Sequence, residues 1–105
     1  MAADKIVVLY VDDEPDNLFS FQATFRLTFK VYTASSGEEA LNLMEQRGFH
    51  VIISDQRMPQ MTGVELFEKI QGKYPDPIRL LLTGFADMNA VIEAVNKGKI
   101  FHYLT

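Results

Sequence analysis

The stretch KIVVLYVDDEP, residues 5–15, gives the first indication of the fold. Its run of Val, Ile and Leu over residues 5–11 is typical of a strand that is buried on both faces. Asp12 and Asp13 follow that strand at once, and Pro15 suits the first turn of a helix. The stretch therefore predicts a strand that ends on two acidic residues and leads directly into a helix.

The alternation of strand and helix continues along the chain. Further strands are predicted at residues 29–34, 51–54, 78–82 and 99–104. Predicted helices start at Pro15, at Ser35 or Ser36 with Glu38 or Glu39 as the capping-box partner, after Gly63, and at Asp87, and the last of them ends at Gly98. In the first helix, Leu18, Phe21 and Phe25 recur at three- and four-residue steps, so we expect them in the core.

Repeated alternation of this kind favours a parallel sheet with helices on both faces. Right-handed crossovers leave few topologies open at this length. We therefore expect an α/β fold, a flavodoxin-like doubly wound parallel sheet of five strands in the order 2-1-3-4-5.

The composition is that of one globular domain of 105 residues, with 48% hydrophobic and 23% charged residues. No apolar run approaches the roughly 20 residues of a membrane span, and no secretory signal is recognisable, so we expect no membrane partner. The absence of cysteine excludes disulfides and thiolate zinc sites and fits a cytoplasmic location. A net charge of −4 with scattered basic residues argues against nucleic-acid binding.

Polar residues that can do chemistry stand where three of the predicted strands end. Asp12 and Asp13 follow the first strand, Asp55 follows the third, and Thr83 and Gly84 follow the fourth. The carboxyl ends of parallel strands meet at one edge of the sheet, where ligands bind in doubly wound folds. We therefore expect three carboxylates and a hydroxyl to converge there.

Clustered carboxylates repel one another unless a cation or a raised pKa relieves them. An all-oxygen set of ligands favours a hard ion, and Mg²⁺ is typically bound by one or two carboxylates together with water and phosphate. A carboxylate such as Asp55 beside that ion can attack phosphorus and form an aspartyl-phosphate. Thr83 can then donate a hydrogen bond to a phosphoryl oxygen, and Gly84 leaves room for that group.

Three segments carry a resemblance to a known family. These are VDDE at residues 11–14, SD at residues 54–55 with Met-Pro at 58–59 and Gly63 beyond, and LTG at residues 82–84. In this order and spacing they resemble the signature segments of the receiver domains of two-component response regulators, over nearly the whole chain.

The resemblance implies a role for each site residue. Asp55 would be the phospho-acceptor, Asp13 a direct metal ligand, and Asp12 a ligand that acts mainly through metal-bound water. The backbone carbonyl of Arg57 would complete the protein ligands of the ion. Thr83 and Tyr103 would be the switch pair, with the hydroxyl moving toward the phosphoryl group and the ring turning inward.

The resemblance also implies partners. A sensor histidine kinase or phosphotransfer protein would donate the phosphoryl group, and an output domain absent from this chain would respond to it. Receivers normally carry a lysine and a fifth helix after the fifth strand, whereas this chain ends at Thr105. We therefore expect a receiver domain over residues 1–105, truncated after the fifth strand, with an exposed sheet face that favours dimers.

Three other functions are open to such a chain. A pseudo-receiver would bind partners without phosphorylation, and the missing lysine slightly favours it. A phosphatase-like enzyme would use Asp55 as nucleophile, but such enzymes usually have a second acid two residues later, where Arg57 stands. A flavodoxin would need a phosphate-binding loop rich in Ser, Thr and Gly after the first strand. We expect no enzyme beyond self-phosphorylation and autodephosphorylation, and structural or solvated roles for His50 and His102.

Overall fold

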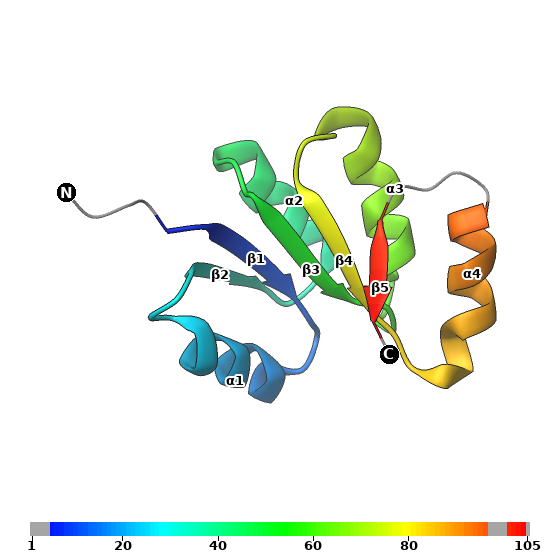
Figure 1. Ribbon diagram of the computed structural model, residues 1–105, viewed down its shortest axis with the longest axis horizontal. Coiled ribbons are helices and arrows are strands. Elements are labelled where there is room, and N and C mark those ends of the chain that lie inside the picture. Colours follow the sequence, from blue (N-terminus) through cyan, green and yellow to red (C-terminus); the bar gives the residue numbers. More distant parts are fainter. Residues whose placement is uncertain (1–4, 97–100, 105) are drawn as a thin grey trace.

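The computed structural model describes residues 5–96 and 101–104, and its strands form a five-stranded parallel sheet in the order β2-β1-β3-β4-β5 (Figure 1). The strands are β1 (Val7–Val11), β2 (Lys30–Ala34), β3 (Val51–Asp55), β4 (Ile78–Leu82) and β5 (His102–Leu104). The helices are α1 (Pro15–Phe25), α2 (Gly37–Gln46), α3 (Gly63–Lys73) and α4 (Met88–Asn96), with a short 3-10 turn, η1 (Phe85–Asp87), before α4. The predicted fold class and strand order are confirmed.

The element boundaries differ from the predictions by small amounts. β1 begins at Val7 rather than at residue 5, and β3 continues one residue further than predicted, to include Asp55. β5 begins at His102, and the predicted start of that strand at Lys99 and the predicted helix end at Gly98 lie outside the described residues.

Local capping interactions explain where two helices start. Of the two starts predicted for α2, the structure has the one at Ser36, whose side chain accepts a hydrogen bond from the Glu39 backbone N–H at 3.1 Å. At α3 the side chains and backbone N–H groups of Thr62 and Glu65 form a reciprocal capping box. Each such cap satisfies backbone N–H groups that have no partner within the helix.

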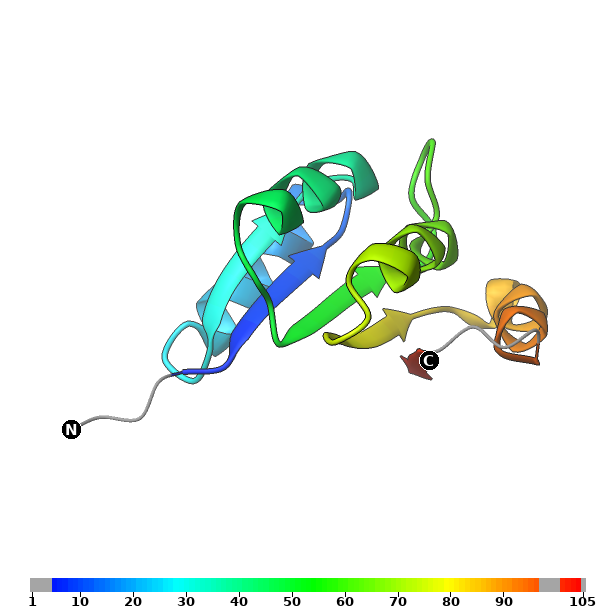
Figure 2. The same ribbon diagram turned by 90° about the horizontal axis from the view of Figure 1, so that it is seen from above.

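The main core lies between the sheet and helices α2 and α3 (Figure 2). Side chains alternate between the two faces of a strand, so the odd-numbered residues of β1 share one face. Leu9 and Val11 on that face pack with Ile52, Leu66 and Ile70, and all five are fully buried. This layer fixes the register of the strands that carry the acidic residues.

Helix α1 lies on the opposite face, where Phe21 stacks on Tyr10 with ring centroids 4.3 Å apart. The prediction that Leu18, Phe21 and Phe25 are core residues overestimated their burial. Helix α1 has no buried residue, and these three are half-buried. Phe21 and Phe25 contact each other, and α1 packs on β2 and β1 alone among the strands with which it makes several contacts, so neither ring is enclosed as it would be between two layers.

The face on the α1 side is open toward β4 and β5. Ile78 and Leu104, which point to this face, are 58% and 55% exposed. This exposure agrees with the predicted apolar sheet surface, whereas association through it stays a prediction. Among the residues the structure describes, no helix has the length and apolar character needed to cross a membrane.

Candidate functional site

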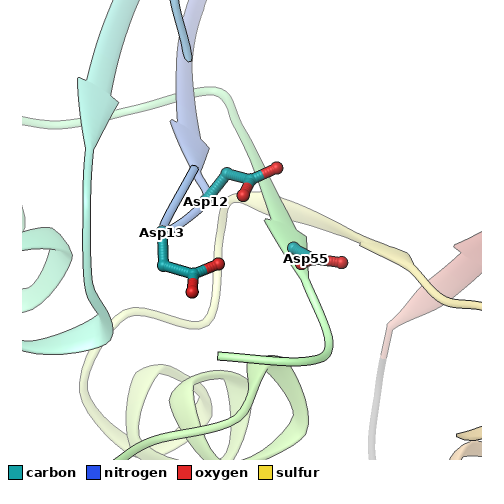
Figure 3. A group of neighbouring side chains, drawn as sticks. All are labelled: Asp12, Asp13 and Asp55. Carbon is teal, nitrogen blue, oxygen red and sulfur yellow. The ribbon is translucent and has the colours of Figure 1, made fainter. Parts of the chain in front are cut away.

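The carboxylates of Asp12, Asp13 and Asp55 come together at the edge of the sheet where the strands end, which we call the carboxyl rim (Figure 3). One oxygen of each carboxylate lies within 4.8 Å of the others. β1 pairs directly with β3, and Val11 is opposite Ser54, so the next residues, Asp12 and Asp55, are brought side by side. The predicted convergence of the three carboxylates is confirmed.

Asp12 is the most enclosed of the three, with 3% of its surface exposed. Its Oδ2 accepts hydrogen bonds from the Tyr10 hydroxyl at 2.8 Å and from Asn17 Nδ2 at 3.1 Å. Its Oδ1 accepts the backbone N–H of Glu14 at 3.0 Å. These bonds hold the Asp12 carboxylate in one orientation, as a buried charge requires.

The pKa of Asp55 is raised above its ordinary value of 3.8. Burial contributes most, the charge of Asp12 comes next, and the charge of Asp13 adds to them, while backbone N–H groups of Gln56 and Arg57 act in the opposite direction. The charges of Asp12 and Asp13 therefore add to the free energy of the ionised Asp55 carboxylate. A bound cation would remove that cost.

The loop after β3 is fixed by Gln56, which is buried. Its backbone N–H donates to Leu82 O at 2.9 Å, and its side-chain oxygen accepts the N–H of Val64 at 2.9 Å. Gly63 passes so close that an added Cβ would lie 2.6 Å from the backbone oxygen of Asp55. This glycine therefore lets the start of α3 close against the end of β3.

Arg57, whose carbonyl was predicted as a metal ligand, lies two residues beyond Asp55 in this loop. Its exposed guanidinium donates to Asp87 Oδ1 at 3.1 Å, and this ion pair raises the pKa of Arg57. Asp87, predicted as a helix cap, is in η1 directly before α4. The ion pair thus connects the loop after β3 with the segment that leads into α4.

Thr83, Gly84 and Tyr103 lie on the side of β4 and β5. Thr83 is buried directly after β4, next to the strand that ends in Asp55, and its N–H donates to Leu104 O at 2.9 Å. Gly84 is exposed, and a Cβ there would meet no atom within 4 Å, so the open space does not depend on glycine. Tyr103 is paired with Leu81, and both lie on the sheet face opposite to that of Leu82. Tyr103 is 38% exposed.

The donor set fits a hard divalent cation. The three residues offer only carboxylate oxygens, the ligand type that Mg²⁺ and Ca²⁺ prefer, and neither His nor Cys is part of the group. The raised pKa of Asp55 adds an electrostatic reason for a cation at this place. The predicted structural role of His50 fits as well, since its Nδ1 accepts the Val7 N–H at 2.9 Å at the other end of the sheet.

The model of the response regulator receiver domain family matches residues 8–105, which include all three carboxylates. The chain belongs to this family. Receiver domains are signalling switches, and the acidic cluster and the strand order of this one agree with that family.

Individual proteins resemble this receiver domain closely. The hydrogenase transcriptional regulatory protein HoxA of Cupriavidus necator is 35% identical over 104 residues, which are 99% of this chain and 22% of HoxA. A crystal structure described as adenylate cyclase from Rhodopirellula baltica has a TM-score of 0.89 and 36% identity, covering 97% of this chain and 76% of the other. A receiver domain protein from Clostridium thermocellum has a TM-score of 0.85 and 29% identity over 94% of this chain and 80% of the other. The chain thus spans about a fifth of the length of the curated relative.

Sequence reasoning missed four residues that support the site: Tyr10, Asn17, Gln56 and Thr62. Tyr10 stands two residues before Asp12, and the alternation of a strand would have placed both on one face. Thr62 and Glu65 form the Thr-x-x-Glu pattern of a capping box. Asn17 and Gln56 carry no such signal, because their contacts depend on how the loops close.

Proposed function

We propose that this receiver domain is a phospho-acceptor signalling switch in which Asp55 takes a phosphoryl group from a histidine kinase or phosphotransfer protein. The observation that carries the proposal is the convergence of three carboxylates, with one oxygen of each within 4.8 Å of the others. Burial, and after it the charges of Asp12 and Asp13, raises the pKa of Asp55, so an ionised Asp55 is costly in this cluster without a cation. A function that uses a cation and a carboxylate nucleophile explains why the charges stand together.

Asp13 and Asp55 would hold Mg²⁺ directly, with the carbonyl of Arg57, while Asp12 would act through a water molecule. The ion would offset negative charge on the transferring group. A carboxylate oxygen of Asp55 attacks phosphorus, and a P–O bond forms as the P–N bond to the donor imidazole breaks. The electron pair of that bond stays on the imidazole nitrogen.

Other residues act on the transferred group. Thr83 follows the neighbouring strand, and its hydroxyl would donate a hydrogen bond to a phosphoryl oxygen. Movement of Thr83 would leave space into which the half-exposed ring of Tyr103 turns. Thr83 and Tyr103 would return to their original positions when water hydrolyses the aspartyl-phosphate. The reactions of this domain would be self-phosphorylation and autodephosphorylation.

We further propose that this receiver works in the cytoplasm as one part of a longer regulator. The curated relative HoxA is named a transcriptional regulatory protein, and this chain corresponds to 22% of its length. An output domain would therefore supply the effect on transcription, and the receiver would control that domain.

Intact-mass measurement with acetyl phosphate tests the proposal. We expect the mass of one phosphoryl group to be added in the presence of Mg²⁺, and none to be added with EDTA. A protein that binds Mg²⁺ but gains no mass from acetyl phosphate or from any histidine kinase would instead be a pseudo-receiver. Steady turnover of phosphate esters would indicate an enzyme of the phosphatase-like class.

A further inference from the structure

The hydrogen bonds of Asp12 are divided unequally between its two oxygens. Oδ2 accepts two side-chain donors, the Tyr10 hydroxyl at 2.8 Å and the Asn17 amide at 3.1 Å. Among the described residues, Oδ1 accepts the backbone N–H of Glu14 at 3.0 Å. A carboxylate oxygen has two lone-pair directions, so Oδ2 has none left, whereas Oδ1 keeps one.

The surroundings of Tyr10 fix the position of its side chain and therefore of its hydroxyl. Tyr10 is the penultimate residue of β1, it is 6% exposed, and its ring stacks on Phe21 with an interplanar angle of 12°. Phe21 in turn contacts Phe25, with ring centroids 4.7 Å apart. The backbone of β1 and the ring stack of α1 therefore fix the place of the hydroxyl on the same sheet face as Asp12.

From this geometry we infer that Tyr10 is a positioning residue of the metal site. Its hydroxyl, together with the Asn17 amide, occupies Oδ2 of Asp12, so that Oδ1 would be the oxygen available to the cation. Asp12 thus offers one oxygen and one free direction, which suits contact through a water molecule, while Asp13 and Asp55 are left to bind directly. The inference rests on the proposed function, because it concerns how the same three carboxylates share one divalent cation.

A purely structural role for Tyr10 makes a different prediction. In that case the ring alone matters, through its burial and its stacking on Phe21, and the hydroxyl only satisfies a buried carboxylate. Replacing Tyr10 by Phe keeps the ring and removes the hydroxyl. Metal affinity separates the two roles, because it depends on the orientation of Asp12, and partners that orient a metal ligand typically contribute about 10–100-fold to affinity.

The test is calorimetric titration of the intact protein with Mg²⁺, for the wild type and for Tyr10→Phe. We expect Tyr10→Phe to weaken Mg²⁺ binding by about 10–100-fold. The matched control is Tyr32→Phe, which removes the hydroxyl of a half-buried tyrosine on the neighbouring strand β2, where it accepts a hydrogen bond from Arg47. The control should bind Mg²⁺ as the wild type does.

Asn17→Ala provides an independent variant, because Asn17 is exposed and its loss leaves the core untouched. It removes the second donor to Oδ2 and should also weaken Mg²⁺ binding. If Tyr10→Phe fails to fold, Asn17→Ala decides the matter alone. Wild-type Mg²⁺ affinity in the folded Tyr10→Phe variant overturns the inference and leaves the proposed function intact. If Tyr10→Phe does not fold, wild-type Mg²⁺ affinity in Asn17→Ala has the same meaning. A wild-type protein that binds no Mg²⁺ overturns both the inference and the proposed function.

Discussion

The charged side chains are arranged differently at the two ends of the sheet. At the carboxyl rim, Asp12, Asp13 and Asp55 lie together, and burial with the charges of Asp12 and Asp13 raises the pKa of Asp55. At the other edge, the amino rim, Lys73 forms an ion pair with Glu45 at 3.7 Å.

Two arginines at the amino rim also have protein partners. Arg47 lies over the ring of Tyr32 and donates to its hydroxyl, and Arg79 donates to the carbonyls of Tyr74 and Pro75. The amino rim also has a hollow of about 410 Å³ between the ends of α2 and α3, and Glu45, Arg47 and Lys73 in its lining each have a protein partner. The charged side chains named at the amino rim are compensated by protein partners, although no ligand is proposed there. The uncompensated repulsion between the carboxylates at the carboxyl rim is therefore an argument for a ligand at that rim.

The largest effect should come from Asp55→Asn. Asparagine has no nucleophilic carboxylate, so incorporation of the phosphoryl group from acetyl phosphate should disappear entirely in intact-mass spectra. The control is Asp76→Asn, which removes an exposed carboxylate at the amino rim and should be phosphorylated as the wild type is. Phosphorylation of the Asp55→Asn variant at another aspartate would break the comparison.

The same variant should gain stability in the absence of metal. Since the pKa of Asp55 is raised in the folded chain, protonation of this group favours folding. The contribution is present in full below pH 3.8, the ordinary pKa, and is lost as the pH rises through the higher folded pKa. Urea denaturation in EDTA should therefore show Asp55→Asn to be the more stable protein at neutral pH, with the difference vanishing in acid.

Asp13→Asn should have the next largest effect, on metal affinity. Loss of a direct charged ligand should weaken Mg²⁺ binding by more than the roughly 10–100-fold typical of supporting residues. Calorimetric titration at neutral pH measures it, with Asp12→Asn beside it. A larger loss for Asp12→Asn than for Asp13→Asn would show that the roles of the two residues are reversed.

A substitution at Gly63 tests the packing that brings the loop against the end of β3. A Cβ there would lie 2.4 Å from Leu81 Cδ1 and 2.6 Å from Asp55 O, so Gly63→Ala should cost about 1–3 kcal/mol of unfolding free energy. Gly72→Ala, later in the same helix, meets no atom within 4 Å and should stabilise by about 0.5–1 kcal/mol. Equal effects of both substitutions in urea denaturation would contradict this account of the loop.

The smallest effect should come from the amino rim. Lys73 and Glu45 are 64% and 62% exposed, so Lys73→Gln should change the unfolding free energy by less than about 1 kcal/mol. Its Mg²⁺ affinity should equal that of the wild type. A clear change in Mg²⁺ affinity would mean that the two rims are coupled.

The sequence alone predicted the parts of the molecule that depend on pattern. The run before Asp12 and the run before Asp55 are predicted as strands because they are largely apolar, and the strand ends of a parallel sheet share an edge. These patterns are sufficient to predict that the three carboxylates lie close together.

The features that escaped prediction depend on tertiary contacts. The spacing of Phe21 and Phe25 predicts which face of α1 is turned toward the sheet, but not how much of that face the neighbouring structure covers. The burial of α1 was therefore overestimated. The contacts of Asn17 and Gln56 form across loops, whose closure no local pattern specifies.

The central claim is that one hard cation is shared by the carboxylates of the carboxyl rim. Crystals of the protein soaked in Mn²⁺ test it most directly, because the anomalous scattering of that ion locates it without ambiguity. We predict a single strong peak in contact with carboxylate oxygens of both Asp13 and Asp55. A peak that touches neither residue, or no peak at this rim, would contradict the account.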